Sequence, residues 1–538
     1  METAKRQKGP RGSERILYVS DPSSIARTLL PDPVREEDLR NWVDMVAASG
    51  VDLFGQEVFS MGWTTYWRSA TYEYDQRPQH RRFLPLIEAG LEPLEILIDQ
   101  THRRGMRFVA GIRVNDNHAH QAREQGVGIA EFIDANPQLQ LRDFPEGEYY
   151  ELSDPLDFSF EEVREFTLGV IRELAARFDI DGIELCYRDY AYFPVGTGRT
   201  RGPLMTDLVQ KIRALLDEGD KKLILGARVF ATIAECENLG LDVPEWIGAR
   251  LIDYVSPQDT MYADFNLPYE PWAALTLDAE CLLFPGLLPW TSFRARYRRN
   301  QIPISNDTAR ALAHTMYRAG ADGISIYNHF VPTLWHPPFY PQAMNIFHQL
   351  RDPDRITRGE RHYIFDPTWA GMTGFGGDGK SSTGALNANQ LRLARSPAGA
   401  SGEYRFYLYE NIADTLGATL LFRGAGLSEN DELEVALNGH PIPAAAITRT
   451  RPSDAPSPGG MIWEREEGER KIPCFPERGR YDFRPAPVPA FSTRWFALTA
   501  ATTVCGQNTL SLTLSHSDPG AGGEAVVIDE VEVWVDPR

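Results

Sequence analysis

The sequence predicts a (β/α)8 barrel of the TIM-barrel type, followed by an all-β, jelly-roll-like sandwich. Between about residues 15 and 355, strand patterns alternate with helical patterns eight times, which favours a parallel sheet closed into a barrel. The turn after the first strand pattern lacks the Gly-rich phosphate fingerprint of an open nucleotide-binding sheet. After about residue 355, helical periodicity gives way to short alternating runs separated by turn residues.

The elements of the first half follow from local patterns. Leu39, Trp42, Val43 and Val46 recur at helical spacing and predict a helix over 36–48. Similar patterns predict helices over 93–104, over 160–178 with Ser159 as N-cap, and over 306–317. Eight apolar runs between such helices predict the barrel strands: 15–20, 51–59, 106–114, 181–187, 222–229, 251–255, 281–284 and 322–327.

The second half predicts an antiparallel sandwich. Asn438-Gly439 is a strong signal for a two-residue hairpin turn. Alternating runs predict strands over 403–409, 418–422, 432–437, 509–514 and 526–535. The expected organisation is a disordered tail over 1–14, a catalytic-type barrel over 15–355 and a carbohydrate-binding-like sandwich over 356–538.

Bulk properties exclude several classes of function. The 538 residues carry a formal charge of −20, from 55 basic and 75 acidic residues, which argues against a nucleic-acid binder. No apolar run is long enough for a membrane span, and residues 1–15 lack the apolar core of a secretory signal. A cytoplasmic location is expected for the chain as it stands, and a secreted or periplasmic one if a leader precedes it. Composition leaves the oligomeric state open.

The five cysteines show no metal-binding spacing, and we expect reduced thiols, with a Cys474–Cys505 disulfide as the alternative. The same chain contains His118-x-His120, a spacing found in some metal sites. The other histidines and the lysine that metal-dependent hydrolases add on later strands are absent, so no metal and no cofactor is expected. A carbon–carbon lyase would need a lysine at a strand end, and none is found.

The most informative strand is 181–187, which ends in charged residues. Side chains two positions apart share one face of a strand, so Glu184, Cys186 and Arg188 point the same way. A carboxylate and a guanidinium on an apolar strand are costly to bury unless they are paired. Their place at the carboxyl end of the strand is typical of a barrel active site.

The other strand ends are also polar, and the loops that follow them are aromatic. Carboxylates beside aromatic faces suit sugar rings, which offer C–H faces for stacking and hydroxyls for hydrogen bonds. The alternative is that the aromatic residues only pin long loops to the barrel rim. The expected substrate-binding residues are Arg113, Asn115, His118, Arg188, Arg228, Trp63, Trp67 and Asn328, and the carboxylates Asp116 and Asp259 lie among them.

Residues 15–350 resemble the family-10-like glycosyl hydrolases, a bacterial barrel group often followed by a β-sandwich. The resemblance rests on Arg113-Val-Asn-Asp-Asn-His118, Phe178-Asp-Ile-Asp-Gly-Ile-Glu-Leu185 with Arg188, Gly240-Leu-Asp-Val-Pro-Glu-Trp246 leading to Leu251-Ile-Asp-Tyr-Val255, Asp264-Phe-Asn-Leu-Pro268 and Ala319-Gly-Ala-Asp-Gly323. It implies glycosidase activity on a poly- or oligosaccharide. The family's fourth strand continues with a second acid, and Cys186 stands there in this chain, which puts activity in doubt.

Glycoside hydrolysis needs a proton donor and a base or nucleophile on opposite sides of the bond. Glu184 is the expected acid, since partial burial raises a carboxyl pKa, with Asp116 or Asp259 as the base of an inverting mechanism. The alternative for Glu184 is a structural salt bridge to Arg188 or Arg113.

Three arginines at strand ends, Arg113, Arg188 and Arg228, suggest an acidic or sulfated sugar, unless they only neutralise nearby carboxylates. The rival function is a catalytically degenerate barrel that binds carbohydrate.

Overall fold

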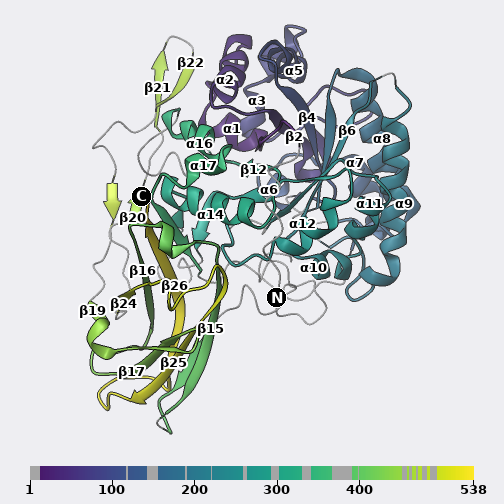
Figure 1. The fold of residues 1–538 in the computed structure, drawn as a ribbon. Coiled ribbons are helices and arrows are strands. Elements are labelled where there is room, and N and C mark those ends of the chain that lie inside the picture. Colours follow the sequence, from purple (N-terminus) through teal and green to yellow (C-terminus); the bar gives the residue numbers. More distant parts are fainter. Residues whose placement is uncertain are drawn as a thin grey trace.

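The structure is a computed structural model in which a helix-covered barrel stands beside a β-sandwich (Figure 1). The described residues are 12–116, 119–141, 155–187, 191–219, 221–258, 263–292, 302–329, 341–365, 391–397, 399–450, 457–459, 463–467, 470–474, 482–484 and 493–537. The tail expected over 1–14 lies mostly outside these ranges. Among the described residues, no helix combines the length and apolar character needed to cross a membrane.

The barrel sheet is parallel and confirms all eight expected strands. Its order is β8-β7-β6-β5-β4-β2-β1-β12-β9, and β8 and β9 are two parts of the seventh strand, separated by Phe284 and Pro285. Proline has no backbone N–H, which accounts for the break. The seventh strand pairs with β7 on one side and β12 on the other, so the barrel closes. The strands are β1 (Ile16–Ser20), β2 (Leu53–Ser60), β4 (Arg107–Arg113), β5 (Gly182–Cys186), β6 (Ile224–Phe230), β7 (Tyr254–Gln258), β8 (Leu282–Leu283), β9 (Gly286–Leu287) and β12 (Ile324–Tyr327).

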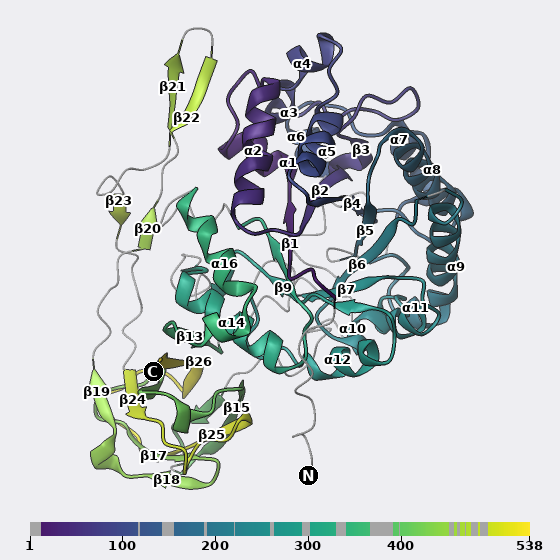
Figure 2. The same cartoon turned by 45° about the horizontal axis from the view of Figure 1, so that its top comes forward.

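Helices surround the sheet (Figure 2) and bury the apolar stripes that predict them. In α2 (Glu36–Ala48) these are the four residues singled out by the sequence. The expected N-cap Ser159 is wrong: α8 begins after Phe160, and no side chain caps it. The other helices are α1 (Pro22–Thr28), α3 (Pro78–Arg81), α4 (Leu84–Glu88), α5 (Pro93–Arg103), α6 (Ala119–Glu124), α7 (Glu131–Ala135), α8 (Glu161–Arg177), α9 (Gly198–Leu216), α10 (Ile233–Asn238), α11 (Val243–Gly248), α12 (Glu270–Leu277), α14 (Asn306–Arg318), α16 (Phe347–Leu350) and α17 (Pro353–Ile356).

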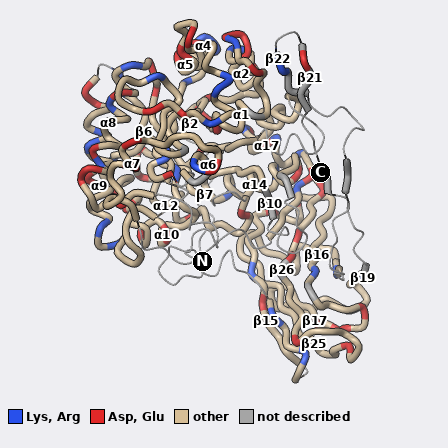
Figure 3. Tube along the Cα trace, turned by 180° about the vertical axis from the view of Figure 1, so that it is seen from behind, with Lys and Arg blue, Asp and Glu red and all other residues tan. Residues whose placement is uncertain are grey.

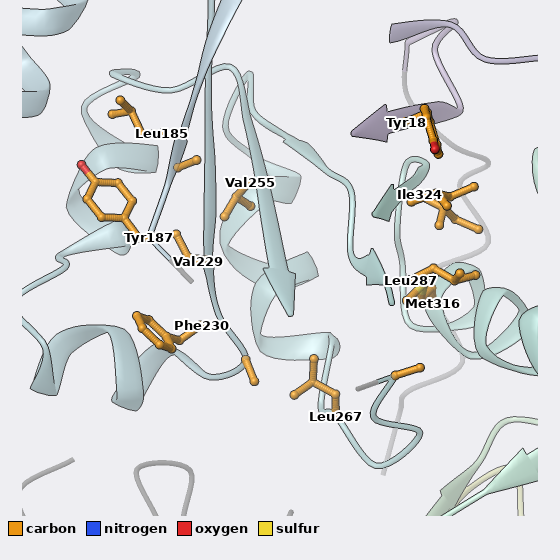
Figure 4. Close-up of a cluster of buried hydrophobic side chains, with 14 of the residues drawn as sticks. Tyr18, Leu185, Tyr187, Val229, Phe230, Val255, Leu267, Leu287, Met316 and Ile324 are labelled. Carbon is orange, nitrogen blue, oxygen red and sulfur yellow. The ribbon is translucent and has the colours of Figure 1, made fainter. Parts of the chain in front are cut away.

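The two faces of β5 separate the apolar wall from the charged interior. Leu185 and Tyr187 point toward the helices, within the apolar layer drawn in Figure 4. Tyr187 packs its ring against Trp246 of α11 at a centroid distance of 5.4 Å. Glu184 and Cys186 therefore face the inside of the barrel, as period-two geometry requires. The outer helices α8 and α9 carry both acidic and basic residues (Figure 3).

The sandwich consists of two antiparallel sheets, β13-β26-β16-β24-β19 with β14 beside β26, and β15-β25-β17-β18. Leu437 pairs with His440, so Asn438 and Gly439 form the predicted two-residue turn, both with positive φ (52° and 79°). The strands are β13 (Arg361–Ile364), β14 (Leu391–Ala394), β15 (Ser401–Leu408), β16 (Gly417–Ala425), β17 (Glu432–Leu437), β18 (His440–Ile442), β19 (Thr448–Thr450), β24 (Thr493–Ala497), β25 (Gly506–His516) and β26 (Ala525–Asp536). The expected domain boundary near residue 355 stays a prediction. Cys505 is a free thiol, so the alternative disulfide with Cys474 is not formed.

One hairpin of the C-terminal half leaves the sandwich and lies against the barrel. It consists of β21 (Trp463–Glu467) and β22 (Arg470–Cys474) and stands beside α2 in both ribbon views. The backbones of Lys471 and Asp32 exchange hydrogen bonds of 2.8 and 2.9 Å, and Arg470 forms an ion pair with Asp38. The sequence placed this segment within the sandwich, because a short strand pattern does not reveal its packing partner.

Candidate functional site

Glu184 and Arg228 form a buried ion pair inside the barrel. Arg228 Nε and Nη2 lie 2.8 and 2.7 Å from Glu184 Oε1, and the Tyr254 hydroxyl donates to Oε2 at 2.9 Å. Glu184 is 2% exposed and Arg228 is fully buried. Three donors on one carboxylate stabilise its ionised form and oppose a role as proton donor. The described salt-bridge partner of Glu184 is Arg228, whereas Arg113 pairs with Glu57 and Asp116, and Arg188 lies outside the described residues.

Two glycines make room for this charged layer. Strand pairing puts Gly111, Glu184 and Gly226 at one level of the barrel. A Cβ at Gly226 would lie 2.0 Å from the Tyr254 ring, and a Cβ at Gly111 would lie 3.1 Å from the Cα of Glu57. Gly226 needs glycine because the Tyr254 ring occupies the space of a side chain, whereas a side chain at Gly111 would be tightly packed against Glu57.

Arg228 reaches further across the interior. Its Nη1 and Nη2 lie 3.5 and 3.4 Å from Gln258 Oε1 and Ser325 Oγ, and its guanidinium stands 5.1 Å from the Tyr327 ring centroid. Two buried polar atoms nearby, Ser256 Oγ and Gln258 Nε2, have no hydrogen-bond partner within the described part of the chain. Buried polar atoms are normally satisfied, so these two groups suit a bound polar molecule.

A second charged group surrounds Arg113. The Nη2 and Nη1 atoms of Arg113 lie 2.9 Å from Glu57 Oε2 and 3.5 Å from Asp116 Oδ1, and Nη2 donates to the Tyr327 hydroxyl at 3.0 Å. Asp116 also accepts the backbone N–H of Gly62 at 2.9 Å, which anchors the loop after β2. All four side chains are buried. Because both carboxylates contact one guanidinium, their contacting oxygens are at most about 9 Å apart, which does not exceed the upper limit of about 9.5 Å for the carboxyl pairs of glycosidases.

A buried network on the loops after β1 and β2 supports this group. Burial alone would raise the pKa of Asp21, but the guanidiniums of Arg113 and Arg77 outweigh it and lower that pKa. His80 Nε2 lies 2.9 Å from Ser23 Oγ and 3.4 Å from Asp75 Oδ2. The serine and the carboxylate contact the same ring nitrogen, which is not the geometry of a catalytic triad. Burial lowers the pKa of His80 to about 4, so its imidazole is neutral near pH 7.

Several expected substrate-binding residues have a packing role. Trp63 and Trp67 are fully buried, and Trp67 Nε1 donates to Glu173 of α8 at 2.8 Å. They pin the loop after β2 to the barrel rim and offer no ring face to a sugar, so the prediction that they bind substrate is corrected.

The two asparagines hold loops together. Asn115 Nδ2 donates to the backbone oxygens of Leu156 and Ala191 at 3.0 and 2.6 Å. Asn328 Oδ1 accepts the backbone N–H of Asp21 at 2.9 Å. These bonds tie the loop after β4 to later segments and the end of β12 to the end of β1. The structure thus assigns Asn115 and Asn328 to loop anchoring.

Three expected site residues, His118, Arg188 and Asp259, lie outside the described residues. Within the described ranges, no group of three or more His, Cys, Asp or Glu side chains is placed to hold a metal ion.

Two tyrosines that complete the site, Tyr254 and Tyr327, were not among the site residues expected from the sequence. Tyr254 and Tyr327 belong to strands whose alternate residues are polar, such as Tyr254-Val-Ser256-Pro-Gln258. This alternation in the sequence indicates that one face of the strand carries polar side chains and points into the barrel.

No protein-family model matches this chain, and neither does any curated protein. Among solved structures, it is similar to an α-L-fucosidase isoenzyme 2 from Paenibacillus thiaminolyticus, with a TM-score of 0.41 and 12% identity, over 65% of this chain and 51% of that one. The chain thus spans about half of that fucosidase.

Two further similar structures are also glycoside hydrolases by name. The PgaB (BpsB) glycoside hydrolase domain from Bordetella bronchiseptica gives a TM-score of 0.40 at 15% identity, over 64% of this chain and 99% of that one. The GH36 α-galactosidase AgaB from Geobacillus stearothermophilus gives 0.40 at 13% identity, over 91% and 56%. With TM-scores below 0.5, these likenesses carry no information on substrate or mechanism.

Proposed function

We propose that this chain is a glycoside hydrolase acting on an oligo- or polysaccharide. The observation that supports the proposal is the charged interior at the carboxyl end of the barrel, where Glu57, Glu184 and Asp116 surround Arg113 and Arg228. Burying charged side chains costs free energy, and a barrel can fold without such a charged interior. The charges also lie at the end of the barrel where barrel enzymes have their active sites.

The geometry supports a revised role for Glu184. Its three hydrogen-bond donors hold the carboxylate in a closed ion pair, which suits a positioning role that fixes Arg228 and Tyr254 beside the reacting groups. Proton transfer then falls to the carboxylates expected at the mouth, Asp116 and Asp259. Asp116 and Glu57 both contact the Arg113 guanidinium, which places a second carboxylate near Asp116.

The substrate that fits this interior is a neutral sugar. Arg113 and Arg228 were two of the three residues behind the acidic or sulfated alternative, and each contacts at least one carboxylate. A guanidinium that is already neutralised adds little net attraction for a sulfate or a uronate.

A second candidate is a degenerate barrel that binds carbohydrate without cleaving it. The specific observations in its favour are Cys186, which stands where the resembled family has an acid, and the closed ion pair of Glu184. The Ser256 Oγ and Gln258 Nε2 atoms, which have no hydrogen-bond partner among the described residues, suit sugar binding in either case.

The test combines a panel of soluble polysaccharides with the wild type, Asp116→Asn and the control Asp134→Asn. Asp134 is a half-exposed carboxylate paired with Arg123, away from the barrel interior. Release of reducing ends by the wild type and the control, with at least a 100-fold loss in Asp116→Asn, supports hydrolysis. Retarded migration in polysaccharide-containing gels without product supports the degenerate barrel, and neither effect with any polysaccharide contradicts both proposals.

A further inference from the structure

A cleft of about 480 Å³ lies between α14 of the barrel and the first strands of the C-terminal half. Its walls come from α14, the turn after α17, the start of β13 and the loop after β15. Ligand pockets commonly measure about 300–1,000 Å³ and often lie between domains. Because α14 ends at Arg318, shortly before β12 begins, the cleft is near the amino ends of the strands, away from the proposed catalytic mouth.

The floor of the cleft is rigid and neutral. Arg361 binds Glu410 through Nε and through Nη2 at 3.1 Å, and its Nη1 donates to the backbone oxygens of Thr357 and Gly359 at 2.8 and 2.7 Å. The Tyr363 hydroxyl donates to Glu410 Oε1 at 2.5 Å. Arg361 and Glu410 are both buried. Their charges cancel, so the floor itself does not select a charged ligand.

His314 contributes a hydrogen-bond acceptor to the same cleft. The Tyr363 hydroxyl uses its hydrogen on Glu410, so its oxygen accepts from His314 Nδ1 at 3.1 Å. The ring proton therefore sits on Nδ1, and Nε2 keeps a lone pair for which the described residues supply no donor. Burial lowers the pKa of His314 to about 4, which keeps the ring neutral near pH 7.

The rim carries two arginines without a carboxylate partner. Arg318 and Arg358 are exposed, and no described carboxylate lies within 4.0 Å of either guanidinium. Arg318 Nη2 donates to the Cys505 sulfur at 3.9 Å. Three arginines and two carboxylates line the cleft, which leaves one net positive charge in a chain whose net charge is −20. Guanidinium groups bind carboxylate, phosphate and sulfate through paired N–H donors.

We propose that this cleft binds a small hydroxylated anion, with the anionic group on Arg318 and Arg358 and a hydroxyl on His314 Nε2. A sugar acid and a sugar phosphate both carry these two groups. Tyr409, which lines the cleft, adds an aromatic wall for a sugar ring. Binding here does not depend on hydrolysis at the barrel mouth, so either proposal can fail alone.

Isothermal titration calorimetry at constant ionic strength tests the proposal with four probes: D-glucuronate, D-glucose 6-phosphate, inorganic phosphate and neutral D-glucose. We expect one or both anionic sugars to bind the wild type and glucose not to bind. The double variant Arg318→Gln/Arg358→Gln should bind the anionic sugars with at least a tenfold loss of affinity. Arg355→Gln is the matched control, because Arg355 is an exposed arginine of α17 that pairs with Asp352 and does not line the cleft.

Cys505 provides a second, local readout. Its thiol is exposed beside Arg318, and mass spectrometry can follow its alkylation by neutral iodoacetamide. A saturating anionic sugar slows this reaction in the wild type and leaves it unchanged in the double variant. No binding by either anionic sugar, equal binding by the double variant, or equal binding by glucose overturns the proposal. Inorganic phosphate that binds as tightly as glucose 6-phosphate overturns the hydroxyl contact with His314.

Discussion

Replacing Arg228 by Met removes the charge partner of a carboxylate that water does not reach. Glu184 would lose two hydrogen bonds, of 2.7 and 2.8 Å, and keep only the Tyr254 hydroxyl. Breaking a buried pair by removing one partner costs about 3–5 kcal/mol, because the remaining charge stays buried. We therefore expect Arg228→Met to lower the free energy of unfolding by about that amount. Urea denaturation followed by tryptophan fluorescence measures it.

The matched control is an ion pair of the same chemistry on the surface. Arg199 and Glu237 lie 2.6 Å apart, but their side chains are 57% and 37% exposed. Such pairs contribute less than about 1 kcal/mol, so Arg199→Met should change stability little. The double variant Glu184→Gln/Arg228→Met should recover at least half of the loss, since it removes the orphaned charge. A loss no larger than that of Arg199→Met, or a double variant no more stable than Arg228→Met, would refute the reasoning.

Two further predictions concern stability. Gly226→Ala should cost about 1–3 kcal/mol, because its Cβ would fall 2.0 Å from the Tyr254 ring, and a melting temperature equal to the wild type would contradict this. Burial lowers the pKa of His80 and of His314 to about 4, whereas an unfolded histidine titrates near pH 6.5. Between these values the unfolded chain binds more protons, so the free energy of unfolding should fall as pH drops from about 6.5 to 4, by up to about 3 kcal/mol per histidine. In the double variant His80→Gln/His314→Gln, the free energy of unfolding should depend less steeply on pH. An unchanged pH dependence would show that these two histidines do not cause it.

The fold was largely predictable because its signals are local. All eight barrel strands appear near their expected positions, and the alternation within 181–187 correctly turned Glu184 and Cys186 to one face. The partner of Glu184 was not predictable from the same signals. Arg228 lies 44 residues away on the next strand, and only the register between β5 and β6 brings the two together.

The sequence also did not predict that the tryptophans at the barrel rim are buried. Trp63 and Trp67 stand among polar loop residues, a composition that fits both an exposed sugar platform and a packed loop. Their contacts come from α8, about a hundred residues later, and so depend on the closed barrel. The sequence shows which loops are rich in aromatic residues. Whether these residues stack on a ligand or pack against a helix depends on the tertiary structure.

The central claim is that the ionised Glu184 inside this barrel serves carbohydrate hydrolysis. The most direct measurement compares the rate of reducing-end release by the wild type and by Glu184→Gln/Arg228→Met, on whichever polysaccharide the wild type cleaves. The double variant separates chemistry from folding, because it removes both charges of the buried pair. We predict at least a 100-fold lower rate in a variant whose circular dichroism matches the wild type. Hydrolysis at the wild-type rate by that folded variant would contradict the claim.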